Sequence, residues 1–432
     1  MELLQSEERF RKVYAELHGT YNILVAYSGG LDSRVLLELC HRAFQARLEY
    51  QLQAVHIHHG LHDKADEWAN HCQFMCNELD IPLRVLHVSV DITNGQSFEE
   101  RARIARRTAW MEVLPKNGTL LLGHHQDDQV ETILYRLCRG TGPKGLSGIS
   151  KRTLIGKGVL IRPFLDLPRT SIASFAMKEK LSWVEDDSNA YQSSDRNFLR
   201  HKVLPFLKKR WSGIESNIAR TGELCAKVTG YLEKKVDDLW PALIGVASNT
   251  LSITRLLALV PILRYEIIRS WILYFDQTLP SKDQMERIEN EIMLARIDKV
   301  PILCLGKYQI RRYRDDLYLL TNYLKYKDKF NFSVDWKYEQ ILNLPYGARL
   351  IARKTVGKGL YLLKSFDNLT IQSGQLGEKA KKIFQKFSIP PWERVFYPAV
   401  FRNSQLLCLV GLWVKKEYLV PSDKVGIVFE IV

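Results

Sequence analysis

The sequence predicts an α/β protein: a doubly wound parallel sheet, a helical middle domain and a small mixed α+β C-terminal domain. Short apolar runs typical of buried strands recur about every 30 residues over the first half, with helical apolar stripes between them. This alternation is the pattern of βαβ units in a parallel sheet. It stops near residue 212, and a chain of 432 residues is long enough for two or three domains of roughly 150 residues. We therefore expect domains at 1–212, 213–330 and 331–432.

The elements of the first half follow from local patterns. The first strand is an apolar run that stops at Ser28-Gly29-Gly30, where glycines mark a turn. Ser97-Phe98-Glu99-Glu100 has the spacing of a capping box, which predicts the start of a helix. Gly140 follows the last helix, at a position where glycine commonly ends one. The predicted strands are 22–27, 52–57, 83–88 and 119–122. The first predicted helix begins after Gly30, and the next three span about 63–79, 97–114 and 127–139.

The second half has a different pattern. Residues 251–275 and 282–295 look helical, without strands between them. Beyond about residue 301, strand-like runs occur at 317–320 and 406–412, and they are mixed with one basic helix near 378–387. This mixture predicts a helical middle domain followed by a mixed C-terminal one.

The charge distribution favours an anionic partner. The chain carries 62 Lys and Arg against 48 Asp and Glu, a net charge of +14. Residues 301–432 hold 22 basic and 11 acidic side chains, and residues 196–210 hold six basic side chains and no acidic one. A single basic run is as often a solvated surface, but two separate zones favour nucleic acid and exclude a protein that repels polyanions.

The sequence also bounds the compartment. The first eight residues are acidic and lack the apolar core of a signal peptide, and no apolar stretch approaches the roughly 18 residues of a membrane span. Seven cysteines in so long a chain form no disulfide framework. We therefore expect a cytoplasmic protein that does not associate with membranes.

The string Ser28-Gly29-Gly30-Leu31-Asp32-Ser33 lies between the first strand and the first helix. Its glycines let backbone N–H groups approach phosphate oxygens, and the helix N-terminus adds partial positive charge. The two serine hydroxyls can donate to the same oxygens, and Asp32 is placed to hold Mg²⁺. The string lacks the lysine of a GxxxxGK[ST] loop. It resembles instead the pyrophosphate loop of the N-type ATP pyrophosphatases, which are Rossmann-like and cleave ATP between the α- and β-phosphates.

A second set of polar residues, 123–132, follows the fourth strand, at the sheet edge where open α/β sheets bind ligands. Asp128 and Glu131 are three residues apart on the next helix, so their carboxylates share one face. Acids near a helix N-terminus often only complement the helix dipole. Beside a phosphate site, however, paired carboxylates predict a pocket for a cation, either Mg²⁺ or an amine-bearing substrate.

Two further groups of polar residues lie in the first half of the chain. The histidines at 56, 58, 59 and 62 suggest zinc, but successive side chains at a strand end alternate faces, so three imidazoles do not converge and we expect no metal there. Residues 186–205 combine acids, amides and arginines without an apolar period. This composition predicts a loop that lines a site and runs into a basic helix.

Together these motifs resemble those of the tRNA(Ile)-lysidine synthase family. The resemblance is dense over about 20–212, looser through the helical middle and specific again near 375–415. Arg107 stands where a tyrosine is expected and Thr141 where a serine is expected, and both bear on local packing rather than on chemistry. The matching segments are 28–33, 56–61, 123–132, 139–140, 187–189, 196–200, 381–384 and 389–392.

The resemblance implies a two-step ligation that consumes ATP. The C2 oxygen of the wobble cytidine in the CAU anticodon of tRNA(Ile) is adenylated, and the ε-amine of free L-lysine then displaces AMP. The products are lysidine, AMP and pyrophosphate, and the modified tRNA reads AUA instead of AUG. Asp128 and Glu131 would orient the amino groups of lysine, and Arg103 would take its carboxylate, with Arg106 as the alternative.

The resemblance also implies the binding residues. The C-terminal part would hold tRNA far from the anticodon, and the target cytidine lies in a loop from which it can be splayed without breaking a duplex. ATP would be bound by Ser28, Gly29, Gly30, Leu31, Asp32, Ser33 and His58, and Mg²⁺ by Asp32. RNA would be bound by Arg196, Asn197, Arg200, Lys379, Lys381, Lys382 and Lys386.

Two alternatives belong to other classes. The tRNA thiolases share the pyrophosphate loop but use a cysteine to carry sulfur, usually in Cys-x-x-Cys, and this sequence has no such motif. A nucleotide- and RNA-binding module without catalysis is the other alternative, and the intact Asp32, Asp128 and Glu131 argue against it. The sequence does not determine the oligomeric state, and a homodimer is left open.

Overall fold

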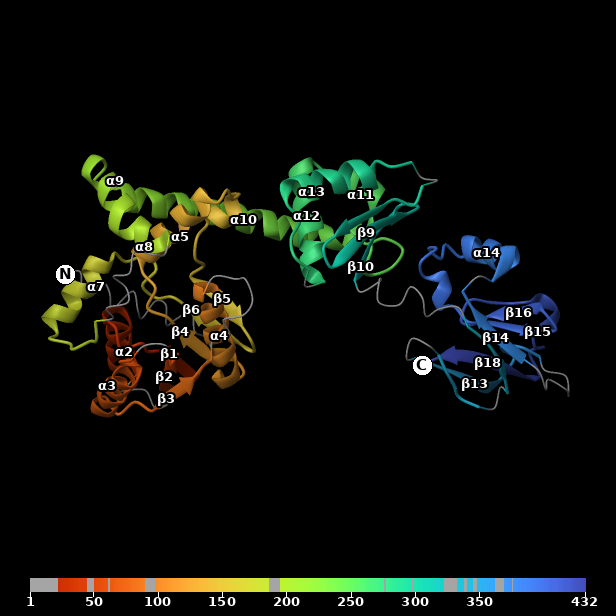
Figure 1. Ribbon diagram of the computed structural model, residues 1–432, viewed down its shortest axis with the longest axis horizontal. Helices are drawn as coiled ribbons and strands as arrows, with labels where there is room; N and C mark the ends of the chain where they lie inside the picture. Colours follow the sequence, from red (N-terminus) through yellow and green to blue (C-terminus); the bar gives the residue numbers. More distant parts are fainter. Residues whose placement is uncertain are drawn as a thin grey trace. The chain divides into compact units, whose positions relative to one another are not determined.

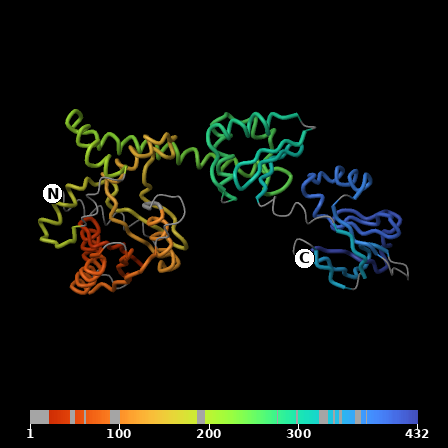
Figure 2. The backbone as a smooth tube through the Cα atoms, viewed as in Figure 1, coloured from red at the N-terminus to blue at the C-terminus, as the bar shows by residue number. Residues whose placement is uncertain are grey.

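The computed structural model describes most of the chain and divides it into two compact units, residues 1–232 and 233–432. Figure 2 traces the backbone, with the stretches outside the description in grey. No helix among the described residues is both long enough and apolar enough to cross a lipid bilayer. The described residues are 22–44, 50–60, 63–89, 98–185, 195–275, 277–296, 299–321, 332–337, 340–344, 348–361, 369–374 and 376–432.

The first unit is built on a six-stranded sheet with the order β3-β2-β1-β4-β6-β5 (Figure 1). Its strands are β1 Asn22–Ala26, β2 Gln51–His58, β3 Leu83–His87, β4 Thr119–Leu121, β5 Arg152–Ile155 and β6 Gly158–Ile161. Neighbouring strands are parallel except for the edge strand β5, which runs antiparallel to β6. The predicted parallel sheet is confirmed.

Helices alternate with these strands, and those predicted in the first half end within two residues of their expected limits. Ser97, the first residue of the predicted capping box, lies outside the described residues. The helices are α2 Leu31–Phe44, α3 Ala65–Glu78, α4 Phe98–Val113, α5 Gln126–Cys138, α6 Pro143–Leu146, α7 Arg169–Lys178, α8 Asp195–Phe198, the π-helix η2 Leu199–Val203, α9 Leu204–Arg210 and α10 Ile214–Leu243.

The sheet has a buried core on each face. Because successive side chains of a strand point to opposite faces, Ile23 and Val25 of β1 enter one core and Leu24 enters the other. The first core also contains Leu36 of α2 together with residues of α3 and α7. In the second core, Trp110 of α4 packs beside strand residues. Helices thus cover both faces, as a doubly wound sheet requires.

The second unit contains three antiparallel sheets, ordered β7-β10-β9-β8, β11-β14-β15-β16-β17 and β12-β13-β18. The first belongs to the middle region, and its elements are β7 Leu251–Ser252, α11 Ile253–Leu257, α12 Pro261–Tyr274, α13 Lys282–Arg287, the π-helix η3 Ile288–Met293, β8 Ile302–Leu305, β9 Tyr308–Tyr313 and β10 Asp316–Thr321. The C-terminal elements are β11 Phe332–Trp336, β12 Leu342–Asn343, β13 Arg349–Val356, β14 Leu369–Ser373, α14 Gly377–Lys386, η5 Arg394–Phe396, β15 Ala399–Arg402, β16 Gln405–Leu409, β17 Trp413–Val414, η6 Lys416–Tyr418 and β18 Val425–Ile431.

The middle region is helical, as expected, but it also carries a sheet that the sequence pattern indicated only at 317–320. The segment 251–275 begins with the two-residue strand β7, in which Leu251 pairs with Leu317 of β10. A strand this short has no measurable periodicity, so only its distant partner defines it. The mixed α+β character of the C-terminal part is confirmed, and the domain limits at 212 and 330 stay predictions.

Removing a core side chain of α2 tests this packing. Leu36 is 0% exposed, so Leu36→Ala should lower the free energy of unfolding by about 2–5 kcal/mol through lost burial and the cavity left behind. Leu154→Ala on the edge strand β5, where the side chain is 75% exposed, should change it by less than about 0.5 kcal/mol. Thermal unfolding followed by circular dichroism measures both variants. Equal melting temperatures would contradict the proposed core.

Candidate active site

The segment Ser28–Ser33 comprises the turn after β1 and the first three residues of α2. Gly29 has φ +87°, a left-handed conformation that glycine adopts without strain. The hydroxyl of Ser33 accepts a hydrogen bond from Ser28 N at 3.2 Å, lies 3.0 Å from Ser28 Oγ and donates to Gly30 O at 2.9 Å. Two hydroxyls therefore lie together at the start of α2, where helical N–H groups lack partners within the helix. This turn suits the oxygens of a phosphate group.

The end of β4 touches this turn. A Cβ atom on Gly123 would lie 3.1 Å from both the carbonyl carbon and the carbonyl oxygen of Asp32, so a side chain there would push the first turn of α2 away. Two residues later, His125 Nε2 lies 3.7 Å from Asp32 Oδ2 and 3.5 Å from Asp128 Oδ2. The structure thus brings Asp32 and Asp128 to the same ring nitrogen of one imidazole. His125 lies within the motif 123–132, but no role was predicted for it from the sequence.

The His125 imidazole is buried between carboxylates. Burial disfavours its charged form, but the carboxylates of Asp32, Asp128 and Asp127 more than offset this and raise the pKa of His125. The backbone N–H of His125 also donates to Asp128 Oδ2 at 2.9 Å, which fixes that carboxylate at the start of α5. His125 therefore joins the loop after β1 to the helix after β4.

Asp32 has the properties expected of a cation ligand. Its Oδ2 lies 3.9 Å from Arg169 Nε, while its Oδ1 is buried and has no hydrogen-bond partner among the described residues. A buried carboxylate oxygen without a partner suits a cation. The described residues include no group of three or more His, Cys, Asp or Glu that could hold a metal. A single carboxylate such as that of Asp32 fits Mg²⁺, which usually takes one or two carboxylates together with water and substrate phosphates.

Glu131 lies on the same face of α5 as Asp128, as predicted, and it already contacts a cation. Arg200 Nε donates to Glu131 Oε1 at 2.5 Å and Arg200 Nη2 donates to Oε2 at 2.8 Å, a bidentate pair. Arg200 Nη2 also lies 3.9 Å from Asp128 Oδ1. Hydrogen bonding to Glu131 raises the pKa of Arg200, so the guanidinium stays charged. Arg200, predicted to bind RNA, thus lies in the site, with two of its nitrogens bonded to Glu131.

Arg103 lies on the exposed side of α4. Burial first, and then the positive charge of Arg103, lower the pKa of both Arg136 and Arg162, that of Arg162 to about 10. Arg162 Nε donates to His124 Nδ1 at 3.1 Å, next to His125 on the chain. A group of arginines therefore lies near the site, which is consistent with an anionic group such as the carboxylate of an amino acid.

The remaining residues predicted for the site are placed less directly. His58, at the end of β2, forms a 2.9 Å hydrogen bond between its Nε2 and Asp66 Oδ1. Arg196 of α8 lies over the ring of Tyr135, 5.8 Å from its centroid, and Asn197 is half-buried beside it. The matching segment 187–189 lies outside the described residues.

The predicted C-terminal RNA-binding residues lie on α14 in the second unit. Lys379, Lys381, Lys382 and Lys386 are all exposed, while Ala380 and Phe384 on the same helix are buried. Lys381 Nζ pairs with Glu378 Oε1 at 3.1 Å, and Lys379 Nζ lies 5.8 Å from the centroid of the Trp413 ring. The helix therefore presents a basic face and an apolar face.

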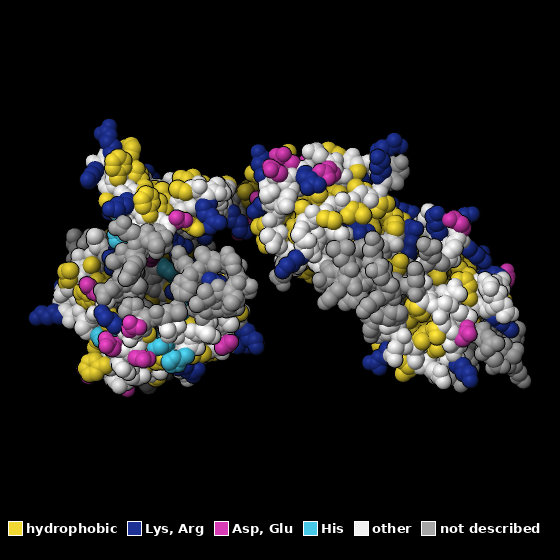
Figure 3. All heavy atoms as spheres, in the orientation of Figure 1, with side chains coloured by type: hydrophobic (Ala, Val, Ile, Leu, Met, Phe, Trp, Pro, Cys, Tyr) yellow, Lys and Arg dark blue, Asp and Glu magenta, His cyan; other side chains and the backbone are white. Residues whose placement is uncertain are grey.

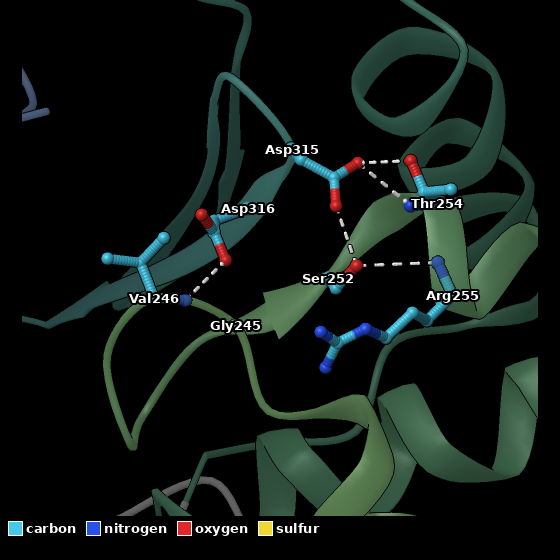
Figure 4. A pocket seen from close by; sticks show the side chains of 7 residues that line it. All are labelled: Gly245, Val246, Ser252, Thr254, Arg255, Asp315 and Asp316. Carbon is cyan, nitrogen blue, oxygen red and sulfur yellow. Dashed lines mark hydrogen bonds between the residues drawn. The ribbon is translucent and has the colours of Figure 1, made fainter.

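The second unit also contains a pocket of about 380 Å³ (Figure 4). Its carboxylates already have partners: Asp315 accepts from Ser252 Oγ at 2.6 Å and from Thr254 N at 2.9 Å, and Asp316 accepts from Val246 N at 2.9 Å. These bonds tie the turn before β10 to the start of α11. This pocket is therefore a structural feature. The candidate active site is instead the edge of the first sheet.

Three family models match parts of this chain. The family described as a PP-loop domain matches residues 3–207, the TilS substrate binding domain matches 251–318, and the TilS substrate C-terminal domain matches 365–431. A tRNA(Ile)-lysidine synthase of Serratia proteamaculans (strain 568) is 37% identical over 416 residues, which cover 93% of this chain and 94% of the relative. That of Coxiella burnetii (strain RSA 493 / Nine Mile phase I) is 35% identical over 432 residues, covering 97% and 95%.

A solved structure of a U34-tRNA thiolase from Methanococcus maripaludis aligns with 52% of this chain and 80% of its own, at 17% identity and a TM-score of 0.43. A likeness at this level adds nothing to the family assignment, which the identity over nearly the whole length of the curated relatives establishes. The chain belongs to the tRNA(Ile)-lysidine synthase family.

Proposed function

We propose that this protein joins free L-lysine to C2 of the wobble cytidine in the CAU anticodon of tRNA(Ile), with conversion of ATP to AMP and pyrophosphate. The observation that carries the proposal is that the phosphate-binding turn after β1 and the Asp128/Glu131 pair after β4 lie at one sheet edge, in a member of this family. One site can therefore bind a nucleoside triphosphate and a cationic amino acid together. We further propose that the enzyme works in the cytoplasm, where tRNA, ATP and lysine are available.

The first step requires a better leaving group, because the C2 oxygen of cytosine is a poor one. Transfer of an adenylyl group to that oxygen supplies it. Ser28, Ser33 and the first N–H groups of α2 would bind the departing pyrophosphate. Asp32 would hold Mg²⁺, which neutralises negative charge that develops on the phosphates. His125, whose pKa is raised by its carboxylate neighbours, would keep Asp32 oriented toward the phosphates.

The second step requires a neutral amine, because the ε-ammonium of lysine, with a reference pKa of about 10.4, cannot attack while protonated. Asp128 and Glu131 would bind the amino groups of lysine and direct the ε-amine at C2. Since Arg200 occupies Glu131, lysine must share that carboxylate or displace the guanidinium. Arg103 would hold the lysine carboxylate, with Arg106 as the alternative.

The direct test is a reaction with purified components. Isoleucine tRNA carrying the CAU anticodon is incubated with the protein, ATP, Mg²⁺ and lysine, and its nucleosides are then separated and weighed by mass spectrometry. Lysidine should replace one cytidine, and omission of lysine should abolish lysidine formation. Unmodified cytidine under complete conditions would refute the proposed function.

The oligomeric state is a separate question. Light scattering of the purified protein would decide whether it is the homodimer that the sequence left open.

Asp32→Ala tests the proposed Mg²⁺ ligand. Loss of one electrostatic contact to the transition state typically lowers the rate by about 100- to 1,000-fold, and adenylate formation should fall at least that far. Binding of tRNA should stay nearly intact, because the charge removed is negative. The exposed Asp63→Asn is the matched control and should keep full activity. ATP–pyrophosphate exchange measures the step, and near-normal exchange in Asp32→Ala would exclude this role.

Asp128→Asn and Glu131→Gln test the lysine site. If these carboxylates bind lysine, each variant should raise the KM for lysine or block the second step while adenylated tRNA accumulates. Glu112→Gln on the exposed side of α4 is the control and should change neither quantity. Quenched-flow sampling with labelled ATP measures the amount of AMP attached to tRNA over time, which separates the first step from the second. An equal loss of both steps would instead assign the pair to the ATP site.

Replacing Lys379, Lys381, Lys382 and Lys386 by alanine tests the C-terminal face for tRNA. Each phosphate contact releases counterions, so the salt dependence of tRNA binding should flatten by up to about four contacts' worth of slope. The rate at saturating tRNA should hardly change, because the candidate active site lies in the other unit. Filter binding at several salt concentrations measures the slope. An unchanged slope would mean that these lysines only solvate α14.

A further inference from the structure

We propose that the exposed side of α9 is a stacking surface for unpaired nucleotides of the RNA substrate. Phe206 would lie against a base, and Lys202, Lys209 and Arg210 would contact the flanking phosphates. The proposal rests on the proposed function for its partner, tRNA, and it adds an aromatic surface that none of the family motifs contains.

The first observation is an exposed aromatic ring on a firmly anchored helix. The side chain of Phe206 is 72% exposed, whereas Leu204, two residues earlier, is 4% exposed and anchors α9 to the rest of the unit. Trp211, directly after the helix, is 55% exposed, and its backbone N–H donates to Leu207 O at 2.8 Å. Both rings are therefore held by backbone that is itself fixed.

The second observation is the charge around Phe206. Lys209 and Arg210 follow it by three and four residues, which places them on the same side of the helix, and Lys202 precedes it by four. These three side chains make no hydrogen bond or ion pair with the described part of the chain, whereas Lys208 pairs with Glu215 at 2.6 Å. Figure 3 shows hydrophobic side chains exposed beside lysine and arginine side chains over α9. Available cations therefore surround an apolar ring.

This combination fits single-stranded RNA better than other partners. Every base has a face that can stack on an aromatic ring, and the adjacent phosphates need cations, so aromatic and basic side chains are interleaved in such surfaces. A membrane-bound helix needs a long continuous apolar face, and Phe206 is the one large apolar side chain that α9, which is described throughout, exposes. A second copy of this surface would bring cations against cations.

The position of α9 suits a substrate nucleotide near the target. The helix continues directly from η2, which carries Arg200 in contact with Glu131. A nucleotide stacked on Phe206 would therefore bind the same continuous helical segment that holds a residue of the candidate active site. The anticodon loop, which is unpaired, supplies such nucleotides beside the wobble cytidine.

The test compares tRNA(Ile) binding by the full-length protein and four variants: Phe206→Ala, Phe206→Leu, Phe74→Ala and the triple Lys202→Gln/Lys209→Gln/Arg210→Gln. Loss of one base–aromatic stack should weaken binding by about 5- to 100-fold in both Phe206 variants, without changing the salt slope. Phe74, 60% exposed on α3 with no lysine or arginine three or four positions away, is the matched control and should bind as the wild type does. The triple variant should flatten the salt slope by up to about three contacts' worth.

The variants separate the possible failures. Phe206→Leu keeps an apolar side chain without a ring face, so wild-type affinity in this variant would overturn the stacking proposal even if Phe206→Ala binds weakly. Loss in Phe206→Ala of binding to vesicles of phosphatidylserine and phosphatidylcholine, with tRNA affinity unchanged, would assign the surface to lipid and overturn it. Absence of tRNA binding by the wild type would instead refute the proposed function. Circular dichroism melting confirms that each variant is folded.

Discussion

The candidate site depends on the parallel pairing of β1 with β4. Val25 lies opposite Leu121, so both strands end at the same edge of the sheet. The chain leaves β1 into the phosphate-binding turn and leaves β4 into His125 and α5, at the point where strand order reverses and α/β sheets bind ligands. Gly123 lets the two segments touch, because a side chain there would meet the backbone of Asp32. Without this pairing, Asp32 and Asp128 would have no common neighbour.

From that edge, charges of alternating sign run through the site. Asp32 lies between Arg169 and His125, Asp128 lies between His125 and Arg200, and Arg200 also binds Glu131. Neighbouring carboxylates repel each other, and the arginine and histidine side chains between them offset that repulsion. Such partly buried pairs add little net stability, because removing ions from water is costly. Their effect is to fix the positions of the carboxylate oxygens in the candidate site.

Arg200 connects two parts of the molecule that the sequence treats as separate. It was predicted within a basic segment for RNA, and the structure places its guanidinium on a carboxylate predicted for lysine. The pair is bidentate, which fixes both its distance and its orientation. The basic segment that follows α8 is therefore not an appendage of the catalytic unit, since it supplies one of the charges of the site.

The sequence by itself determined the parallel sheet, the glycine-serine turn after β1 and the shared face of Asp128 and Glu131. Each depends on residues close together in the chain: apolar periodicity, a glycine-serine string, or a spacing of three on a helix. Only the tertiary structure decided that His125 and Arg169 flank Asp32, that Arg200 contacts Glu131 across 69 residues, and that β7 pairs with β10. The physical reason is that packing selects partners distant in sequence, and a local pattern shows that a charge or an apolar residue is present without showing what it meets.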